Sequence, residues 1–260
     1  MKIPPSLSLS LLAFLVANTL AGATLKATYS FTGNLNPDEA GVPALSPVDP
    51  LGQNGFITET VFGQTDSVYR FFGNASPTSQ QAGFTLNVSG LITPNSYSVE
   101  LIFTFDGLSG YRRIIDTFDR QSDAGFYVNP SSHLEVFPAG GAGANTFTAG
   151  YHHVILTVAA DGTIKGYIDG LTDLTTSTTV MNISNSPSST MTFFLDNVAA
   201  GGQGEFSPGK IAQLRLYDGV LTDAEALALS QTPLVPEPGT LALVALGTAA
   251  LASRAVRPRR

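Results

Sequence analysis

The chain has 260 residues, a formal net charge of −7 and no cysteine. Its length allows a sizeable core, while the missing cysteine excludes disulfides, thiol catalysis and zinc held by cysteine. Nucleic acids and anionic lipids attract clustered lysine and arginine, so the acidic balance argues against both as partners. A composition rich in Gly, Ser, Thr, Val and Phe favours strands and turns over helix bundles.

The first 23 residues have the form of a secretory signal peptide. Lys2 gives the positive start, and the apolar run "LSLLAFLVANTLAGA" follows at residues 9–23. Ala21 and Ala23 supply the small-x-small pattern that signal peptidase reads. We therefore expect an exported chain that is cleaved after Ala23. The alternative is a buried N-terminal helix.

Short alternating runs follow in the body of the chain, residues 24–233, and predict strands. The longest, "YSVELIFTF", is expected to be half-buried, with its aromatic residues on one face. Asp161-Gly162 lies between two such runs and predicts a hairpin. The predicted strands are residues 97–105, 112–118, 125–129, 133–137, 151–159, 163–170, 191–196 and 210–218.

One helix is predicted, at residues 221–230, where Thr222 and Glu225 form a capping box before an apolar run. Residues 33–55 look like a loop, and residues 172–179 are either an exposed edge strand or a loop. Many strands with almost no helix favour an all-β, two-sheet antiparallel sandwich. The body has no interior linker or repeat, so we expect one domain.

The last segment, residues 235–260, has three parts. A Pro-Glu-Pro triplet (Pro236, Glu237, Pro238) is followed by an apolar stretch at 240–253. This stretch is shorter than the roughly 20 residues that a simple membrane span needs. The prolines separate it from the body, and the basic residues after it favour a cytoplasmic C-terminus. These basic residues are Arg254, Arg257, Arg259 and Arg260.

This order of triplet, apolar helix and arginines resembles the PEP-CTERM sorting signal of Gram-negative bacteria. The resemblance implies processing near Val235–Pro238 by an exosortase, an integral-membrane protease-transpeptidase. It also implies transient insertion of a C-terminal transmembrane helix, and delivery to the cell surface or the extracellular (biofilm) matrix. The alternative is a plain tail anchor. Without both terminal segments, the body keeps 8 basic and 19 acidic residues, a charge of −11.

The body itself resembles the laminin-G-like, or concanavalin A-like, jelly roll. The resemblance rests on "GYRRIIDTFDRQSDAGFYV", "AGYHHVILTVAADGTIKGYIDG" and "GKIAQLRLYDGVLTDAEALAL", in this order. It implies two stacked antiparallel sheets whose loops or concave face bind sugars or proteins, often near a Ca²⁺. Fold alone does not name the ligand.

Catalysis is not expected. A retaining glycosidase needs two carboxylates about 5 Å apart, and on one strand these must share a face. Asp116 and Asp119 have an odd spacing, and the pair Asp223 and Glu225 belongs to the helix start. The Glu-x-Asp-x-x-Glu pattern of the β-glucanases of this fold is absent, and no histidine has an alginate-lyase-like context.

Aromatic and histidine residues receive structural interpretations. His152 and His153 point to opposite faces of one strand, so they cannot chelate one metal together. We expect one ring to pack inward and the other to face out. Four tyrosines are candidates for stacking on a sugar, but they lie in alternating runs, where core packing competes with ligand binding. They are Tyr69, Tyr111, Tyr127 and Tyr217.

A calcium site is the sharper metal hypothesis. Asp196 and Asn197 end a predicted strand, a Gly-rich loop follows, and the loop presents Glu205. Asp123 is a further loop carboxylate. Ca²⁺ prefers several oxygen ligands from flexible loops. The alternative is that Asp196 and Asn197 form turns and that Glu205 is solvated.

Three functions remain from this reading. The first is a non-catalytic module that binds extracellular carbohydrate or glycoprotein. The second is a structural matrix component without a small ligand. The third is a glycoside-active enzyme, which would need two acids that converge in a cleft.

Overall fold

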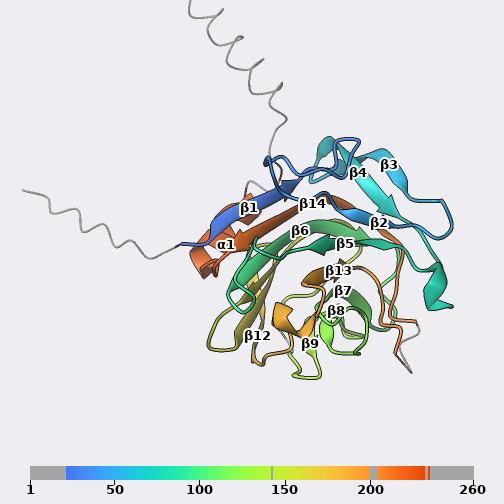
Figure 1. Ribbon diagram of the computed structural model, residues 1–260. Helices are drawn as coiled ribbons and strands as arrows, with labels where there is room; N and C mark the ends of the chain where they lie inside the picture. The colour runs from blue at the N-terminus through green and yellow to red at the C-terminus, as the bar shows by residue number, and fades with distance from the viewer. Residues whose placement is uncertain (1–21, 142, 200–203, 232–233, 235–260) are drawn as a thin grey trace, which may run out of the picture.

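The computed structural model describes residues 22–141, 143–199, 204–231 and 234. It contains two antiparallel sheets packed as a sandwich (Figure 1). Nearly all of the predicted signal peptide and of the sorting tail, including the apolar stretch 240–253, lies outside these residues. In the described part of the chain, no helix has the length and apolar character to cross a membrane.

The larger sheet has eight strands. Seven lie in the order β12-β11-β10-β6-β14-β4-β3, and β1 pairs with β14. All pairings are antiparallel. The strands are β1 (Thr24–Tyr29), β3 (Gly55–Val61), β4 (Gln64–Phe71), β6 (Tyr97–Phe105), β10 (His152–Val158), β11 (Thr163–Ile168), β12 (Leu171–Ser177) and β14 (Gly209–Asp218).

The smaller sheet has six strands in the order β2-β5-β13-β7-β8-β9. They are β2 (Ser46–Val48), β5 (Gly83–Asn87), β7 (Arg112–Asp116), β8 (Gly125–Val128), β9 (Leu134–Phe137) and β13 (Thr190–Phe193). Two short 3₁₀ turns lie at Thr78–Gln80 and Ile183–Asn185. Sequential neighbours often sit in different sheets, so the chain crosses repeatedly between the layers, as a jelly roll requires.

Aromatic rings fill the space between the sheets. Phe194, just after β13, stacks on Phe71 of β4 with ring centroids 4.2 Å apart. The ring centroid of Phe103, in β6, lies 5.2 Å from that of Phe194. Because alternate strand residues face inward, these contacts confirm the two-sheet sandwich that the alternating pattern predicts.

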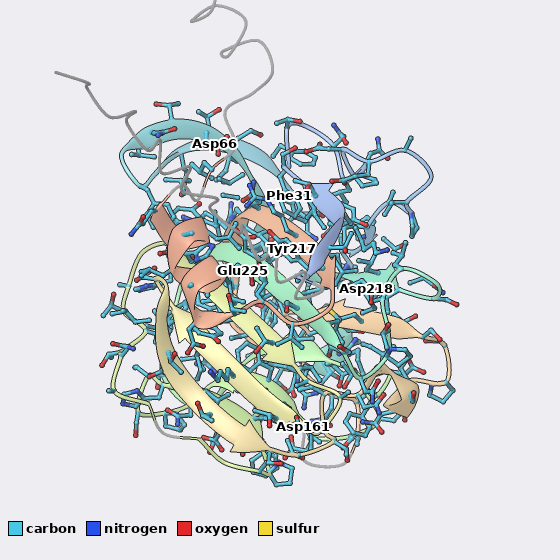
Figure 2. All side chains as sticks on the ribbon, turned by 90° about the vertical axis from the view of Figure 1, so that its left-hand side faces the viewer. Phe31, Asp66, Asp161, Tyr217, Asp218 and Glu225 are labelled. Atoms are coloured by element: carbon cyan, nitrogen blue, oxygen red, sulfur yellow. The ribbon has the colours of Figure 1, made fainter. Side chains whose placement is uncertain are left out.

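The helix α1 (Asp223–Gln231) covers the outer face of the larger sheet, which Figure 2 views from the front. Its predicted capping box is confirmed: Glu225 accepts a hydrogen bond from the backbone N–H of Thr222 at 2.8 Å and donates its own N–H to the Thr222 hydroxyl at 3.2 Å. Ala226 and Leu221 pack on Tyr167 and Tyr217 of the sheet.

The burial of the strand at 97–105 differs from the prediction. The strand at 97–105 was expected to be half-buried, but all nine residues of β6 are buried. The segment entering α1 lies over the strand, and Ser98 accepts a hydrogen bond from the Leu221 N–H at 2.9 Å. The expectation of a polar, solvated outer face is therefore wrong.

The other predicted strands are confirmed to within a few residues, and so is the hairpin at Asp161-Gly162, which joins β10 to β11. Residues 172–179 are mostly strand: β12 is an edge of the larger sheet. The predicted loop at 33–55 contains the short edge strand β2. The strands β1, β3, β4 and β5 were not predicted individually.

The β3–β4 hairpin has an unusual turn. Its two central residues, Phe62 and Gly63, have φ angles of +49° and +81°. A two-residue turn of this kind favours Asn-Gly, because asparagine and glycine tolerate positive φ, whereas a bulky side chain does not. A phenylalanine at this position therefore strains the turn.

We expect Phe62→Asn to raise the melting temperature by about 2–4 °C, because relief of left-handed strain is worth about 1 kcal/mol. Differential scanning calorimetry measures the shift. Phe62→Ala is the control, since alanine removes the ring but keeps the unfavourable φ. Equal shifts for both variants would contradict the strain.

Candidate functional site

The four residues of the calcium hypothesis come together in the structure, although two loops far apart in the sequence carry them. Asp123 lies between β7 and β8, Asp196 and Asn197 follow β13, and Glu205 precedes β14. The Asn197 Nδ2 donates to Oδ1 of Asp123 at 3.0 Å and to Oδ1 of Asp196 at 3.3 Å. The Glu205 N–H donates to Oδ2 of Asp196 at 3.3 Å.

Their centre is occupied by the side chain of Arg113, in β7, which is fully buried. Its Nη1 lies 2.6 Å from Oδ2 of Asp116. Its other nitrogens lie 3.6 Å from Asp123, 3.9 Å from Asp196 and 4.0 Å from Glu205. The guanidinium also stands over the Tyr127 ring, 4.8 Å from its centroid. We call Arg113, Asp116, Asp123, Asp196, Asn197 and Glu205 the Arg113 cluster.

The cluster is thus built around the positive charge of Arg113, a residue that the calcium hypothesis did not include. Arg113 also donates to the backbone oxygens of Ser122 and Asp123, at 3.2 and 2.9 Å, and so fixes the loop that carries Asp123. The one signal in the sequence was an arginine at a strand position whose neighbours, Ile114 and Ile115, are core residues. A buried guanidinium needs carboxylate partners.

Three buried polar atoms of the Arg113 cluster have no hydrogen-bond partner among the described residues. They are Nε of Arg113, Oδ1 of Asn197 and Oε2 of Glu205. In the same part of the chain, no three Asp, Glu, His or Cys side chains are grouped in a way that would hold a metal ion. Any cation would therefore depend on amide and backbone oxygens as well, at the outer edge of the cluster.

The cluster has more negative than positive charge, and Glu205 responds to it. Burial, followed by the negative charges of Asp196 and Asp123, raises the pKa of Glu205 to about 7. Burial also raises the pKa of Asp116, against the opposing charge of Arg113. Both carboxyls are therefore held in an environment that resists their ionisation.

We expect Glu205→Gln to be more stable than the native chain by about 1–3 kcal/mol at pH 8, and nearly equal to it at pH 4. The folded-state pKa of about 7 exceeds the ordinary 4.5. The contribution of the protonated carboxyl to folding stability is therefore complete below the ordinary pKa. It is lost as the pH rises through the folded-state pKa. Urea unfolding at both pH values measures it. Glu135→Gln is the control, and a gain that is equal at both pH values would contradict the shift.

The two histidines lie on opposite faces of β10, as predicted, but neither is solvated. The inward ring, His152, bonds Asp169 through Nδ1 at 2.8 Å and accepts the Thr148 N–H at Nε2. The outward ring, His153, is only 1% exposed and bonds Glu100 through Nε2 at 2.9 Å. The outward orientation of His153 agrees with the prediction, but the ring is buried because the outer face of the sheet is covered.

Glu100 is the centre of that covered face. Besides His153, it accepts hydrogen bonds from Nη1 of Arg215 at 2.9 Å and from the Tyr217 hydroxyl at 2.6 Å. Burial alone would raise the pKa of Glu100, but the hydrogen bond from His153 and the charge of Arg215 outweigh it and hold the pKa below its ordinary value. Glu100 is therefore a buried anion with three partners.

The remaining acids and tyrosines have structural partners. Asp119 accepts hydrogen bonds from Ser188, whereas Asp116 belongs to the Arg113 cluster, so the two do not form a catalytic pair. Three of the candidate stacking tyrosines are buried: Tyr69, Tyr127 and Tyr217. Only Tyr111 is partly exposed, beside Tyr127 with ring centroids 5.7 Å apart.

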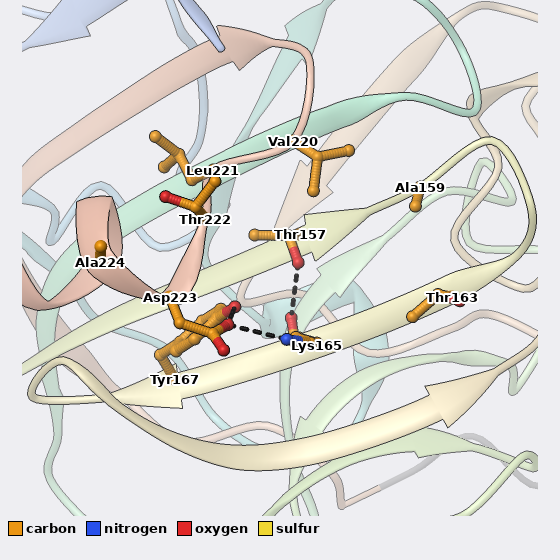
Figure 3. A pocket seen from close by; sticks show the side chains of 10 residues that line it. All are labelled: Thr157, Ala159, Thr163, Lys165, Tyr167, Val220, Leu221, Thr222, Asp223 and Ala224. Atoms are coloured by element: carbon orange, nitrogen blue, oxygen red, sulfur yellow. Dashed lines mark hydrogen bonds and ion pairs between the residues drawn. The ribbon is translucent and has the colours of Figure 1, made fainter. Parts of the chain in front are cut away.

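A pocket of about 510 Å³ lies on the outer face of the larger sheet, between β10, β11 and the start of α1 (Figure 3). Asp223 points into it from the first turn of α1 and accepts hydrogen bonds from Nζ of Lys165 and from the Tyr167 hydroxyl, both at 2.7 Å. Its lining combines these groups with small apolar and hydroxyl side chains: Thr157, Ala159, Thr163, Val220, Leu221, Thr222 and Ala224.

The sequence profile of the Laminin_G_3 family, described as the concanavalin A-like lectin/glucanases superfamily, matches residues 78–226. The chain belongs to this superfamily. A second profile, the PEP-CTERM protein-sorting motif, matches residues 234–260 and marks an exported protein. No curated protein sequence matches the chain.

Solved structures share the concanavalin A-like fold at low identity. Domain 4 of AbnA, a GH43 extracellular arabinanase from Geobacillus stearothermophilus solved with arabinotriose, is 17% identical, with a TM-score of 0.57 over 80% of this chain and 99% of that one. Botulinum neurotoxin type C, from a study of its interaction with two ganglioside molecules, is 12% identical, with a TM-score of 0.57 over 83% of this chain. The match covers only 52% of the toxin chain.

Proposed function

We propose that this exported protein is a non-catalytic module that binds extracellular carbohydrate or the glycan of a glycoprotein. The observation that carries the proposal is the pocket beside α1, whose volume of about 510 Å³ suits a small saccharide unit. Two similar folds support it, since one was solved with arabinotriose and the other belongs to a toxin whose cell entry depends on gangliosides.

The chemistry of the pocket fits a sugar ring. Lys165 and Asp223 form an ion pair at 2.7 Å and present a donor and an acceptor side by side. A sugar hydroxyl can both donate and accept a hydrogen bond. Two adjacent hydroxyls can therefore bind at the same time, one accepting from Lys165 and the other donating to Asp223. The wall formed by Val220 and Ala224 offers apolar surface to the C–H groups of the ring.

The test is a glycan array probed with the full-length protein in detergent, with Lys165→Ala as the variant. We expect binding to a defined glycan class that Lys165→Ala weakens. Lys210→Ala is the matched control, because Lys210 also forms an ion pair on this sheet, with Glu59 at 2.8 Å, but lies outside the pocket lining. Release of sugar from a bound glycan would indicate an enzyme instead. No binding at all would favour a structural matrix component.

Calcium at the outer edge of the Arg113 cluster is a second proposal. The oxygens that support it are Oδ1 of Asn197 and Oε2 of Glu205, which lack donors, together with the half-exposed carboxylate of Asp123. A ligand that binds only the folded state raises the unfolding midpoint. We expect Ca²⁺ to raise it and Asp123→Asn to abolish the rise, with Glu135→Gln unchanged. No rise would leave Arg113 as the sole cation of the cluster.

The sorting proposal is that signal peptidase removes the first 23 residues and that an exosortase then processes the chain near Val235–Pro238 for delivery to the cell surface or extracellular matrix. The PEP-CTERM match at 234–260 supports it. Replacing Pro236, Glu237 and Pro238 by alanine should leave the precursor in the membrane fraction. Surface delivery of this variant would contradict the proposal.

A further inference from the structure

The β3–β4 hairpin carries an exposed aromatic residue at a strained position. Phe62 sits at the tip with φ +49° and is 44% exposed. Phe56 and Ile57, in the adjoining edge strand β3, are also more than a third exposed. A residue that breaks the local turn preference and also exposes a large ring points to a role outside the fold itself.

The hairpin lies beside Leu234, the last residue that the structure describes. Val61, the last residue of β3, belongs to a small buried cluster on the outer face of the larger sheet, with Val68, Ile102 and Ala212. Leu234 packs against this cluster. Figure 2 shows α1 running toward the end of the molecule where Asp66 of β4 lies.

Leu234 is also the first residue of the PEP-CTERM motif. Only residues 235–239 separate it from the apolar stretch at 240–253. Even fully extended, this connection spans about 20 Å. A tail inserted in a membrane therefore holds Leu234, and the hairpin beside it, close to the lipid surface.

The charge of the hairpin selects the kind of lipid. Residues 55–66 contain no lysine or arginine and two acids, Asp66 and Glu59. Glu59 pairs with Lys210 at 2.8 Å. Anionic headgroups need basic residues, whereas an aromatic ring suits the boundary between headgroups and acyl chains of an uncharged bilayer. We propose that the β3–β4 hairpin contacts the bilayer through Phe62 while the sorting tail is inserted. The proposal rests on the proposed insertion of that tail.

The chain contains no tryptophan, so Phe62→Trp introduces a single fluorescent probe. The full-length variant is reconstituted with phosphatidylcholine vesicles, and flotation reports whether the tail inserts. We expect a blue-shifted emission and about twofold quenching when the acyl chains are brominated, as for a ring at the lipid boundary. Gln64→Trp, on the other side of the turn, repeats the measurement with Phe62 intact if the first variant unfolds.

Ala160→Trp is the control. Ala160 is an exposed residue of the β10–β11 turn, beside Asp161, which Figure 2 shows at the end of the molecule opposite Asp66. We expect no quenching at this position. Protein that fails to float contradicts insertion of the tail and, with it, the hairpin contact. If the protein floats but the tryptophan at the hairpin stays unquenched, the lipid contact is overturned while insertion of the tail stands. The same holds if the emission shifts only after an exosortase is added.

Discussion

Replacing Arg113 by methionine is expected to lower the free energy of unfolding by about 3–5 kcal/mol, the usual cost of removing one partner from a buried ion pair. The variant leaves Asp116 and Asp196 buried without the guanidinium that lies 2.6 and 3.9 Å from them. It also releases the loop whose backbone oxygens, at Ser122 and Asp123, accept from Arg113. Urea unfolding followed by circular dichroism measures the loss.

Arg113→Lys separates charge from shape. Lysine keeps the positive charge but lacks the planar fork that reaches several oxygens at once. We therefore expect it to restore only part of the loss. Arg112→Gln is the matched control, because Arg112 is the neighbouring arginine of β7 but is partly exposed and forms no ion pair in the described residues. Equal losses at both arginines would contradict the central role of Arg113.

Glu100→Gln is expected to lower the free energy of unfolding at pH 7 by about 2–4 kcal/mol, because it leaves the Arg215 guanidinium buried without its counter-ion. The pKa of Glu100 lies below its ordinary value. Its contribution is therefore present above the unfolded-state pKa and is lost as pH falls through the lower, folded-state pKa. The difference between variant and native chain should accordingly shrink in acid.

Chemical denaturation from pH 7 to pH 3 measures this difference. Glu59→Gln is the control, since Glu59 forms a comparable pair with Lys210 but its side chain is 29% exposed. An exposed pair of this kind contributes about 1 kcal/mol or less. A Glu100→Gln loss as small as that of Glu59→Gln would show that the buried network adds little.

The sequence predicted the sandwich because apolar and polar residues alternate along most of its longest strand, residues 97–105, with Ile102 as the one apolar exception. The run at 97–105 and the hairpin at Asp161-Gly162 have patterns that few other folds satisfy. The strands β3 and β4 were not named, because β3 is a mostly exposed edge strand rich in polar residues, so it lacks a clear apolar face. The full burial of β6 depends on groups that are distant along the chain: the segment entering α1 contacts Ser98, and Val61 and Val68 of the β3–β4 hairpin pack with Ile102.

The candidate sites, too, could be predicted from the sequence only in part. The contacts among Asp123, Asp196, Asn197 and Glu205 agree with their grouping in the calcium hypothesis, since loop side chains rich in oxygen can reach one another across two connections. That they surround an arginine was not predicted, since Arg113 reaches them only through side-chain geometry. The pocket beside α1 was missed for a similar reason: Lys165 and Asp223 are 58 residues apart, and only the packing of α1 on β11 brings them together.

Binding of a glycan in the pocket beside α1 is the central claim, and isothermal titration tests it most directly. The best ligand from the array is titrated into the native protein, into Asp223→Asn and into Lys210→Ala. Loss of one charged hydrogen-bond partner should weaken binding about tenfold for Asp223→Asn and leave Lys210→Ala unchanged. Equal affinities for all three proteins would contradict the claim and place the ligand elsewhere on the molecule.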